Sequence, residues 1–263
     1  MTLAGFDLSI LWPALVAGLL VTATHVPLGT QVLARGIVFI DLAIAQIAGC
    51  GVLLANRVGF EAEGVAVQVA ALVAALAGAM LLTWTERIWP DVQEAVIGVV
   101  FVLAATGGIL MLAGDVRGSE HLRDLLVGQI LWAEPARLAW AAGVYAVVLA
   151  LWFGIGERMG RVGFYALFAV AVTVSVQLVG LYLVFATLIV PPLATRRMAR
   201  GRIAAAWAVG AAGYAVGLVV STAFDLPSGP VIVWMLCVLG LVAYAIHGRT
   251  GAVTNRNAPA HPA

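Results

Sequence analysis

The longest uncharged stretch of the sequence limits what this chain can fold into. No charged residue occurs between Phe164 and Ala194, whereas one membrane crossing needs about 20 apolar residues. The stretch is too long for one upright helix and too short for two complete ones. Gln177 and Gly180 stand where such a stretch would break, so we expect one full helix followed by a short returning helix. A single long, tilted helix is the alternative.

Two adjacent prolines and a group of arginines follow the expected break. Pro191 and Pro192 should stop the returning helix, because proline has no backbone N–H and its ring clashes with the preceding turn. Basic residues gather in cytoplasmic loops, so the chain is expected to leave the membrane on the cytoplasmic side here. The arginines are Arg196, Arg197, Arg200 and Arg202.

The composition is that of an integral membrane protein. Of the 263 residues, 63% are hydrophobic and 10% are charged, well outside the range of soluble domains. We expect an all-α membrane domain over residues 1–247, with about eight or nine membrane segments, in the inner membrane of the cell. Residues 248–263 are expected to form a short polar cytoplasmic tail. The formal net charge of +1 argues against a nucleic-acid partner.

Seven other apolar segments are long enough to be membrane helices, and a shorter piece over 125–132 suggests a re-entrant or interfacial turn. The arginine-rich loops at Arg158 and at Arg196 can both be cytoplasmic only if the chain between them enters the membrane and returns. This independently supports the break, and it places the N-terminus outside. The seven segments are Leu8–Gly29, Gly36–Asn56, Val65–Trp84, Glu94–Gly114, Ala136–Gly156, Ile203–Phe224 and Val231–His247.

The end of the uncharged stretch resembles a signature of the metal-importing ABC permeases. Residues 179–195 read VGLYLVFATLIVPPLAT, and that family carries V-G-x-x-L-V-x-A-L-L-x-x-P-A-A-T-A before its contact with the ATPase subunit. Three more blocks are similar to the same family in order and spacing, namely residues 27–35, 94–101 and 126–131. The connection before the uncharged stretch is shorter than in most of the family.

The resemblance implies a type II ABC importer permease fold with one broken helix. It also implies a membrane-spanning permease of an ATP-driven importer for divalent transition metal ions, zinc or manganese, with the metal as substrate and no cofactor. The implied partners are a second copy in a homodimer, a cytoplasmic ABC ATPase and an extracytoplasmic metal-binding protein. The chain itself should not be an enzyme, because the sequence has no G-x-x-x-x-G-K-[ST] phosphate loop.

Two alternatives keep a transport function. The same fold could import an iron chelate or a cobalamin-like substrate through a wider, less polar path. A stand-alone secondary transporter usually shows internal repeats and more intramembrane charge, and neither is convincing here. An intramembrane enzyme would need a catalytic pair inside the membrane, where Asp41 is the only carboxylate well inside an apolar segment.

The candidate metal residues are Asp41, His25 and Gln46. The family usually carries G-D-x-x-x-H in its second segment, but here Gln46 falls where the histidine would be and Asp41 precedes the usual aspartate position. An amide is a poorer zinc ligand than an imidazole. His25 is expected at a comparable depth on the adjoining antiparallel helix, and a carboxylate with an imidazole suits zinc or manganese. Alternatively, Asp41 and His25 form a buried hydrogen-bonded pair that locks the first hairpin.

The residues after the prolines are the expected contact with the ATPase. A short surface helix there would place Arg197 and Arg200 near one face, and Thr195 would cap its first turn. The alternative is that the arginines only anchor the loop to anionic lipid. The expected coupling residues are Thr195, Arg196, Arg197, Met198 and Arg200.

Overall fold

The computed structural model describes residues 8–60, 64–112, 130–132 and 134–256, and within them the chain is helical with no strand. Eight helices in these ranges are long and apolar enough to span a membrane, and α8 is shorter, which confirms the expected all-α membrane fold. The helices are α1 (Leu8–Arg35), α2 (Ile40–Val58), α3 (Val65–Ile88), η2 (Pro90–Val92), α4 (Gln93–Leu112), η3 (Ile130–Trp132), α6 (Pro135–Ile155), η4 (Gly156–Arg158), α7 (Gly160–Val179), α8 (Leu181–Ala194), α9 (Arg202–Phe224) and α10 (Ser228–Arg256).

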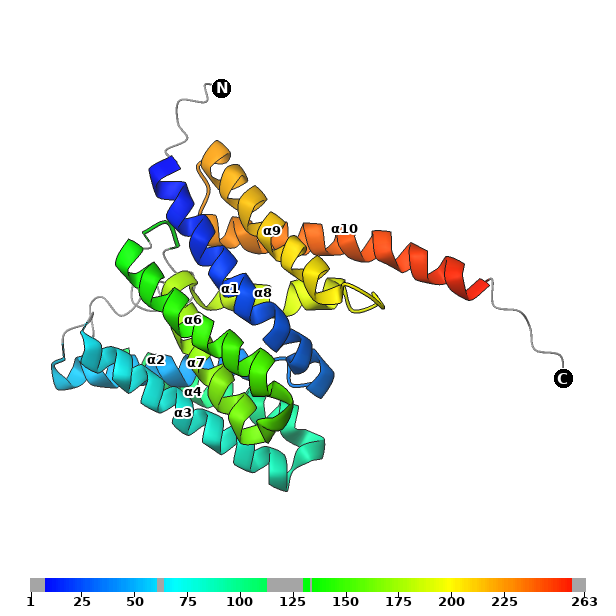
Figure 1. Ribbon diagram of the computed structural model, residues 1–263. Coiled ribbons are helices and arrows are strands. Elements are labelled where there is room, and N and C mark those ends of the chain that lie inside the picture. Colours follow the sequence, from blue (N-terminus) through cyan, green and yellow to red (C-terminus); the bar gives the residue numbers. More distant parts are fainter. Residues whose placement is uncertain (1–7, 61–63, 113–129, 133, 257–263) are drawn as a thin grey trace.

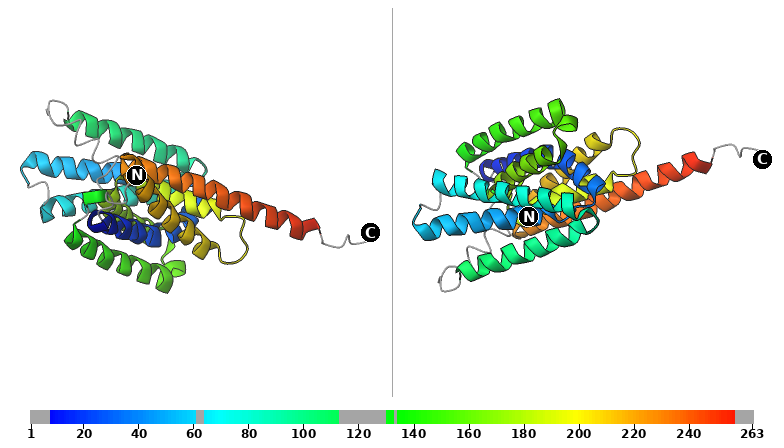
Figure 2. Two further views of the ribbon diagram at one scale, coloured as in Figure 1. Left: turned by 90° about the horizontal axis from the view of Figure 1, so that it is seen from above. Right: turned by 90° about the horizontal axis from the view of Figure 1, so that it is seen from below.

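The helices form two groups (Figure 1). In one group, α2 packs against α3 and α4. In the other, α1 packs against α8 and α9, and α10 also packs against α8 and α9. Helix α7 joins the groups, because it contacts α2 and α3 as well as α1 and α8. Helix α10 extends beyond the rest of the bundle towards the C-terminus (Figure 2).

The interior of the bundle is built on α7, α8 and α1. Over the most apolar 18-residue stretch of α7, 72% of the residues are buried, whereas over the corresponding stretch of α4 the buried share is 11%. Helices α4, α6 and α10 therefore present most of their apolar surface outwards, as helices do where lipid or another subunit covers them. The uncharged stretch from which the prediction started is thus the core of the molecule.

The broken helix is confirmed, and the break is a single residue. Gly180 separates α7 from α8 with φ 85° and ψ 160°, a backbone region that is essentially restricted to glycine. Its N–H still bonds to the Val176 carbonyl, and its own carbonyl accepts from the N–H of Val184. One glycine therefore reverses the chain without leaving its own backbone groups unpaired.

The prediction that the two prolines stop the returning helix is wrong. Pro191 and Pro192 lie inside α8, which ends at Ala194. Both rings fall in the final turn, where the Leu188 carbonyl, which loses its intrahelical donor to the prolines, is covered by Gly29 of α1. The N–H and the hydroxyl of Thr195 both bond to the Pro191 carbonyl, at 3.3 and 3.1 Å. These bonds end the helix two residues after Pro192.

Several segment ends also differ from the prediction. Helix α1 continues through Pro27 to Arg35, and α10 continues past His247 to Arg256, so part of the expected polar tail is helical. Of the short apolar piece at 125–132, the structure describes only residues 130–132, as a 3₁₀ turn. Most of the block at 126–131 and the end of the tail lie outside the described residues.

Two contacts of arginine side chains bring helix ends together on one side of the bundle. Arg161, at the start of α7, pairs with Glu86 near the end of α3 at 3.7 Å. The Arg35 guanidinium lies 4.3 Å from the centre of the Phe164 ring. The ends of α1 and α3 therefore meet the start of α7, as the arginine pattern predicts.

Candidate functional site

His25 is held in the interior of α1 with one ring nitrogen free. Its side chain is fully buried, and Nδ1 lies 3.1 Å from the Val21 carbonyl and 3.0 Å from the Thr24 hydroxyl. A carbonyl can only accept, so Nδ1 donates to Val21 and Nε2 carries the lone pair. Nε2 has no hydrogen-bond partner within the part of the chain that the structure describes. A neutral imidazole fixed through Nδ1 in this way is ready to bind a cation through Nε2.

The free nitrogen belongs to a face of α1 that packs on α8 and α9. Gly18, Thr22, His25 and Gly29 follow one another at helical spacing and share this face. A side chain at Gly18 would collide with the Tyr214 ring of α9, and one at Gly29 with the Leu188 carbonyl of α8. His25 therefore stands between two close contacts of α1, facing the inner helices and not the membrane.

Asp41 is a second buried polar group without a partner. It is the second residue of α2, it is fully buried, and neither carboxylate oxygen has a partner with hydrogen-bond geometry among the described residues. Two residues earlier, the backbone N–H of Phe39 donates to Glu94 Oε1 at 3.3 Å. Asp41 and Glu94 thus place two carboxylates near the start of α2, where the positive end of the helix dipole favours negative charge.

The structure does not bring the three candidate metal residues together. Helix α1 packs mainly on α6, α7, α8 and α9, whereas α2 packs on α3, α4, α7 and α8, so the first two helices do not form a packed hairpin. The alternative of a hydrogen-bonded Asp41–His25 pair is wrong, because His25 Nε2 and both Asp41 oxygens lack partners. Gly36, with φ 70°, turns the chain away from α1 between the two helices.

Gln46 lies apart from Asp41 on the same helix. Five residues separate them, which is about 140° around an α-helix, and Gln46 is half-buried whereas Asp41 is fully buried. Among the residues that the structure describes, no three His, Cys, Asp or Glu side chains are close enough to hold a metal ion together. Within one copy of the chain, the described residues therefore offer individual metal ligands and no complete metal site.

The expected coupling helix is not formed. Residues 195–201 make a turn and an irregular bend, because α8 ends at Ala194 and α9 begins after Gly201, which has φ 67°. Thr195 is fully buried and caps the end of α8, so it does not start a new helix. The guanidinium groups of Arg196 and Arg197 lie 5.8 and 4.7 Å from the centre of the Tyr244 ring of α10.

The rest of this loop is available at the surface. Arg200 is exposed and Met198 is half-buried. A cavity of about 540 Å³ adjoins the loop between α8 and α10, and Leu193, Cys237 and Tyr244 are among its lining residues. Arginines beside an apolar hollow thus stand where the sequence predicted the ATPase contact, presented by a bend instead of a helix.

Sequence reasoning missed two buried tyrosines that join the inner helices. Tyr145 of α6 is hydrogen-bonded to Ser175 of α7 at 2.7 Å, and Tyr214 of α9 to Thr187 of α8 at 2.9 Å. A tyrosine in the middle of an apolar segment was the available signal, because a buried hydroxyl needs a partner. The partner's identity could not be read from the sequence, since each pair is far apart along the chain.

A sequence profile of the ABC 3 transport family matches residues 7–160 and 150–247. This chain belongs to the ABC 3 transport family. A relative, the uncharacterized membrane protein slr2045 of Synechocystis sp. (strain PCC 6803), is 25% identical over 254 residues, covering 88% of this chain and 89% of the relative.

Two solved structures share the fold of this ABC 3 family chain. One is a chain of PsaBC from Streptococcus pneumoniae in complex with Fab, with a TM-score of 0.77, 21% identity and 96% of each chain covered. The other is an inward-facing conformation of a putative metal-chelate type ABC transporter, with a TM-score of 0.63 and 14% identity, covering 91% of this chain and 85% of the other.

Membership in the family decides the broad role of the chain. It is a multi-pass membrane protein and the permease of an ABC-type importer of metals or their chelates. It is a transport subunit and not an enzyme, because ATP hydrolysis belongs to a separate subunit. The family therefore implies an ATPase partner and a substrate-binding partner.

Proposed function

We propose that this chain is the membrane permease of an ATP-driven importer of a divalent transition metal, zinc or manganese. The observation that carries the proposal is His25, a buried imidazole whose Nδ1 is tied to the backbone while Nε2 stays free. Imidazole is a common ligand of transition metals, and an unpaired polar group inside a membrane protein is costly enough to suggest a function. A single such ligand suits a transit step, because cargo must leave as readily as it enters.

Asp41 is the second proposed contact of the passing metal. Its two oxygens are buried and have no hydrogen-bond partner among the described residues, so a cation at the start of α2 would stabilise the ionised carboxylate, which burial alone disfavours. Gln46 is assigned a minor role, as a half-buried amide beside the route. Because the residues stand apart, the proposal is a sequence of weak contacts along a path and not a storage site.

We propose further that the route runs between two copies of the chain. Gln177 is exposed although it sits in α7, the most buried membrane-spanning helix. An exposed amide within an apolar helix is favourable only if it faces water or another subunit. A homodimer with Gln177 at the central path satisfies both conditions. Measurement of the mass of the purified permease in detergent checks this, with twice 27.3 kDa expected after correction for detergent.

Uptake by proteoliposomes tests the cargo. The permease, reconstituted with its ATPase and binding protein, should accumulate radioactive zinc or manganese when ATP is supplied. His25→Ala and Asp41→Asn should abolish this uptake while the ATPase still co-purifies. Thr222→Val is the control, because it removes a partly buried polar group of another membrane helix, a hydroxyl bonded within α9, and it should transport normally.

The same assay separates the proposal from its rival, import of a metal chelate. The absence of a three-ligand group among the described residues favours this rival, because a chelated metal needs no protein ligands. A ferric chelate or a cobalamin-like substrate should then be taken up, and His25→Ala should leave that uptake unchanged. Normal zinc and manganese uptake by both variants would remove His25 and Asp41 from the mechanism.

A further inference from the structure

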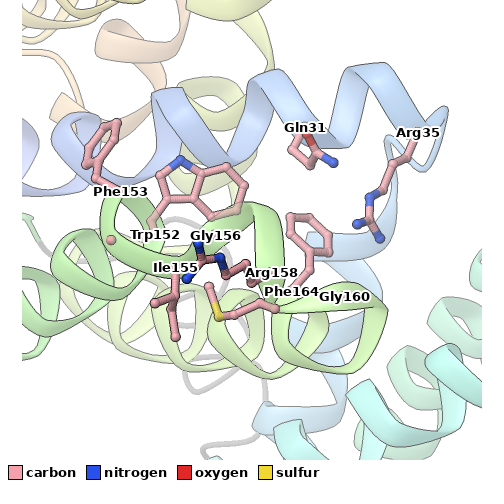
Figure 3. Close-up of a pocket in the computed structure, with 11 residues that line it drawn as sticks. Gln31, Arg35, Trp152, Phe153, Ile155, Gly156, Arg158, Gly160 and Phe164 are labelled. Atoms are coloured by element: carbon pink, nitrogen blue, oxygen red, sulfur yellow. The ribbon is translucent and has the colours of Figure 1, made fainter.

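A cavity at the arginine-rich face of the bundle has no part in the proposed transport route. It has a volume of about 610 Å³ and lies between the end of α1, the end of α6 with η4, and the start of α7. Figure 3 shows α1 along one side of it, with Gln31 and Arg35 on that helix and Trp152 and Phe164 facing them. The lining includes Gln31, Arg35, Trp152, Phe153, Arg158 and Phe164.

The cavity is positively charged. Arg35 and Arg158 both line it, and its described lining contains no carboxylate. Arg35 is fixed against the Phe164 ring at 4.3 Å, and its Nη1 is buried without a hydrogen-bond partner. A guanidinium that is held in place and has donors without partners among the described residues is suited to bind a phosphate or carboxylate oxygen.

One side of the same cavity is apolar and open. Phe153 and Ile155 line it, and they are 60% and 46% exposed. Both residues belong to the end of α6, a helix with 22% of its most apolar window buried, so their exposed surface faces outwards. A ligand that fills the cavity therefore meets cations at one end and exposed hydrocarbon at the other.

The arginine pattern assigns the cavity to the cytoplasmic edge of the membrane, where anionic lipid is found. Arg35 and η4 belong to the side of the bundle that carries the Arg161–Glu86 pair, which the arginine pattern assigns to the cytoplasm. The cytoplasmic leaflet is negatively charged, and basic pockets between helices on that side suit phospholipid head groups. Trp152 adds an aromatic ring of the kind enriched at this level of the bilayer.

We propose that this cavity binds the phosphate head group of an anionic phospholipid. Arg35 and Arg158 contact the phosphate oxygens, Gln31 supplies an amide donor, and an acyl chain lies over Phe153 and Ile155. A free phosphate ion would meet the same arginines, but it would leave the apolar side bare. The lipid would tie α1, α6 and α7 together at their cytoplasmic ends. The proposal does not depend on which cargo the permease carries.

Native mass spectrometry of the purified full-length permease tests the proposal. The protein is titrated with dioleoyl-phosphatidylglycerol and, separately, with dioleoyl-phosphatidylcholine. We expect one phosphatidylglycerol to bind more tightly than phosphatidylcholine. Arg158→Gln should weaken it about fivefold, the effect of about one arginine near an anionic surface, and Arg35→Gln by at least as much. Arg87→Gln is the matched control, because Arg87 is an exposed arginine on the same side that does not line the cavity, and it should bind as the wild type does.

The other possible results would contradict binding of an anionic phospholipid in this cavity. Equal binding of the two phospholipids, or equal weakening by Arg87→Gln, would show that general charge and not the cavity is responsible. If millimolar inorganic phosphate displaces phosphatidylglycerol and alone raises the melting temperature as much, the site takes a free anion. If Arg158→Gln keeps the lipid but loses the co-purifying ATPase, the arginines contact a carboxylate of that partner. Arg158 is exposed, so its replacement should leave the fold intact.

Discussion

At the scale of single residues, the returning helix contains a backbone carbonyl that has no donor within its own helix. The Leu188 carbonyl would normally accept from residue 192, or from residue 191 in a tighter turn, and both are proline. Gly29 of α1 lies directly against this oxygen, where any side chain would collide with it. The proline pair thus frees a carbonyl, and a glycine lets the neighbouring helix cover it, with a weak Cα–H contact as the available compensation.

This contact predicts a specific sensitivity to an added methyl group. Gly29→Ala should destabilise the permease by about 1–3 kcal/mol, the usual result of overpacking, because α1 must move away from α8. Gly143→Ala in α6 is the matched control, since nothing lies within 4 Å of the added carbon, and alanine there should be neutral or slightly stabilising. Thermal unfolding of both variants in detergent measures the difference. Equal melting temperatures would show that α1 does not approach α8 this closely.

The same residues show why sequence reasoning succeeds for some features and fails for others. The break at Gly180 was predictable because length and the lack of charge are properties of one continuous segment. The role of Pro191 and Pro192 was not, because proline is tolerated in a final turn whose carbonyls are covered by another helix. The depth of His25 and Asp41 in the membrane could be estimated, because it follows from counting residues along each helix. Their separation depends on which helices pack together, and no local pattern encodes that.

At the scale of elements, the bend between α8 and α9 is the segment best placed to pass motion to the core. Its N-terminal neighbour α8 is buried between α1, α9 and α10, and the buried Thr195 joins the bend to that helix. Arg196 and Arg197 pack over Tyr244, so the bend is also linked to α10. A force applied to this bend by an ATPase would therefore reach the helices that surround His25.

This arrangement predicts how substitutions in the bend affect ATPase binding. Met198→Asp keeps the arginines but replaces the half-buried apolar side chain of the bend with a charge, so the ATPase should be lost from a pull-down. Arg196→Lys with Arg200→Lys keeps the charge and removes the planar guanidinium groups, so binding should weaken. Leu226→Asp is the matched control, because Leu226 is exposed in the loop between α9 and α10, at the other end of these helices. Normal recovery of the ATPase with both bend variants would mean that the arginines serve only to contact lipid.

At the scale of the whole molecule, the charge distribution and the packing give one orientation. The interior helices carry the uncharged stretch, whereas the arginines lie at helix ends, and the contacts of Arg35 and Arg161 gather several of those ends on one side. Arg196 follows the short returning helix, so it reaches the same side only because α7 and α8 reverse at Gly180. A straight helix over this stretch would move Arg196 and all later loops to the opposite face. Sidedness is therefore a property of the whole chain that rests on one glycine.

Cysteine labelling measures this orientation directly. In a background with Cys50→Ala and Cys237→Ala, we expect Phe60→Cys to react with an impermeant thiol reagent in intact cells. Phe60 is 52% exposed just beyond the end of α2, on the side that the arginine pattern predicts to be external. Arg87→Cys, at the end of α3 beside the Glu86–Arg161 pair, should react only after the cells are permeabilised. The two positions are joined by a single membrane helix, so they must differ. Reaction of the cysteine at 87 in intact cells, with none at 60, would invert the orientation and would place the arginine-rich face outside the cell.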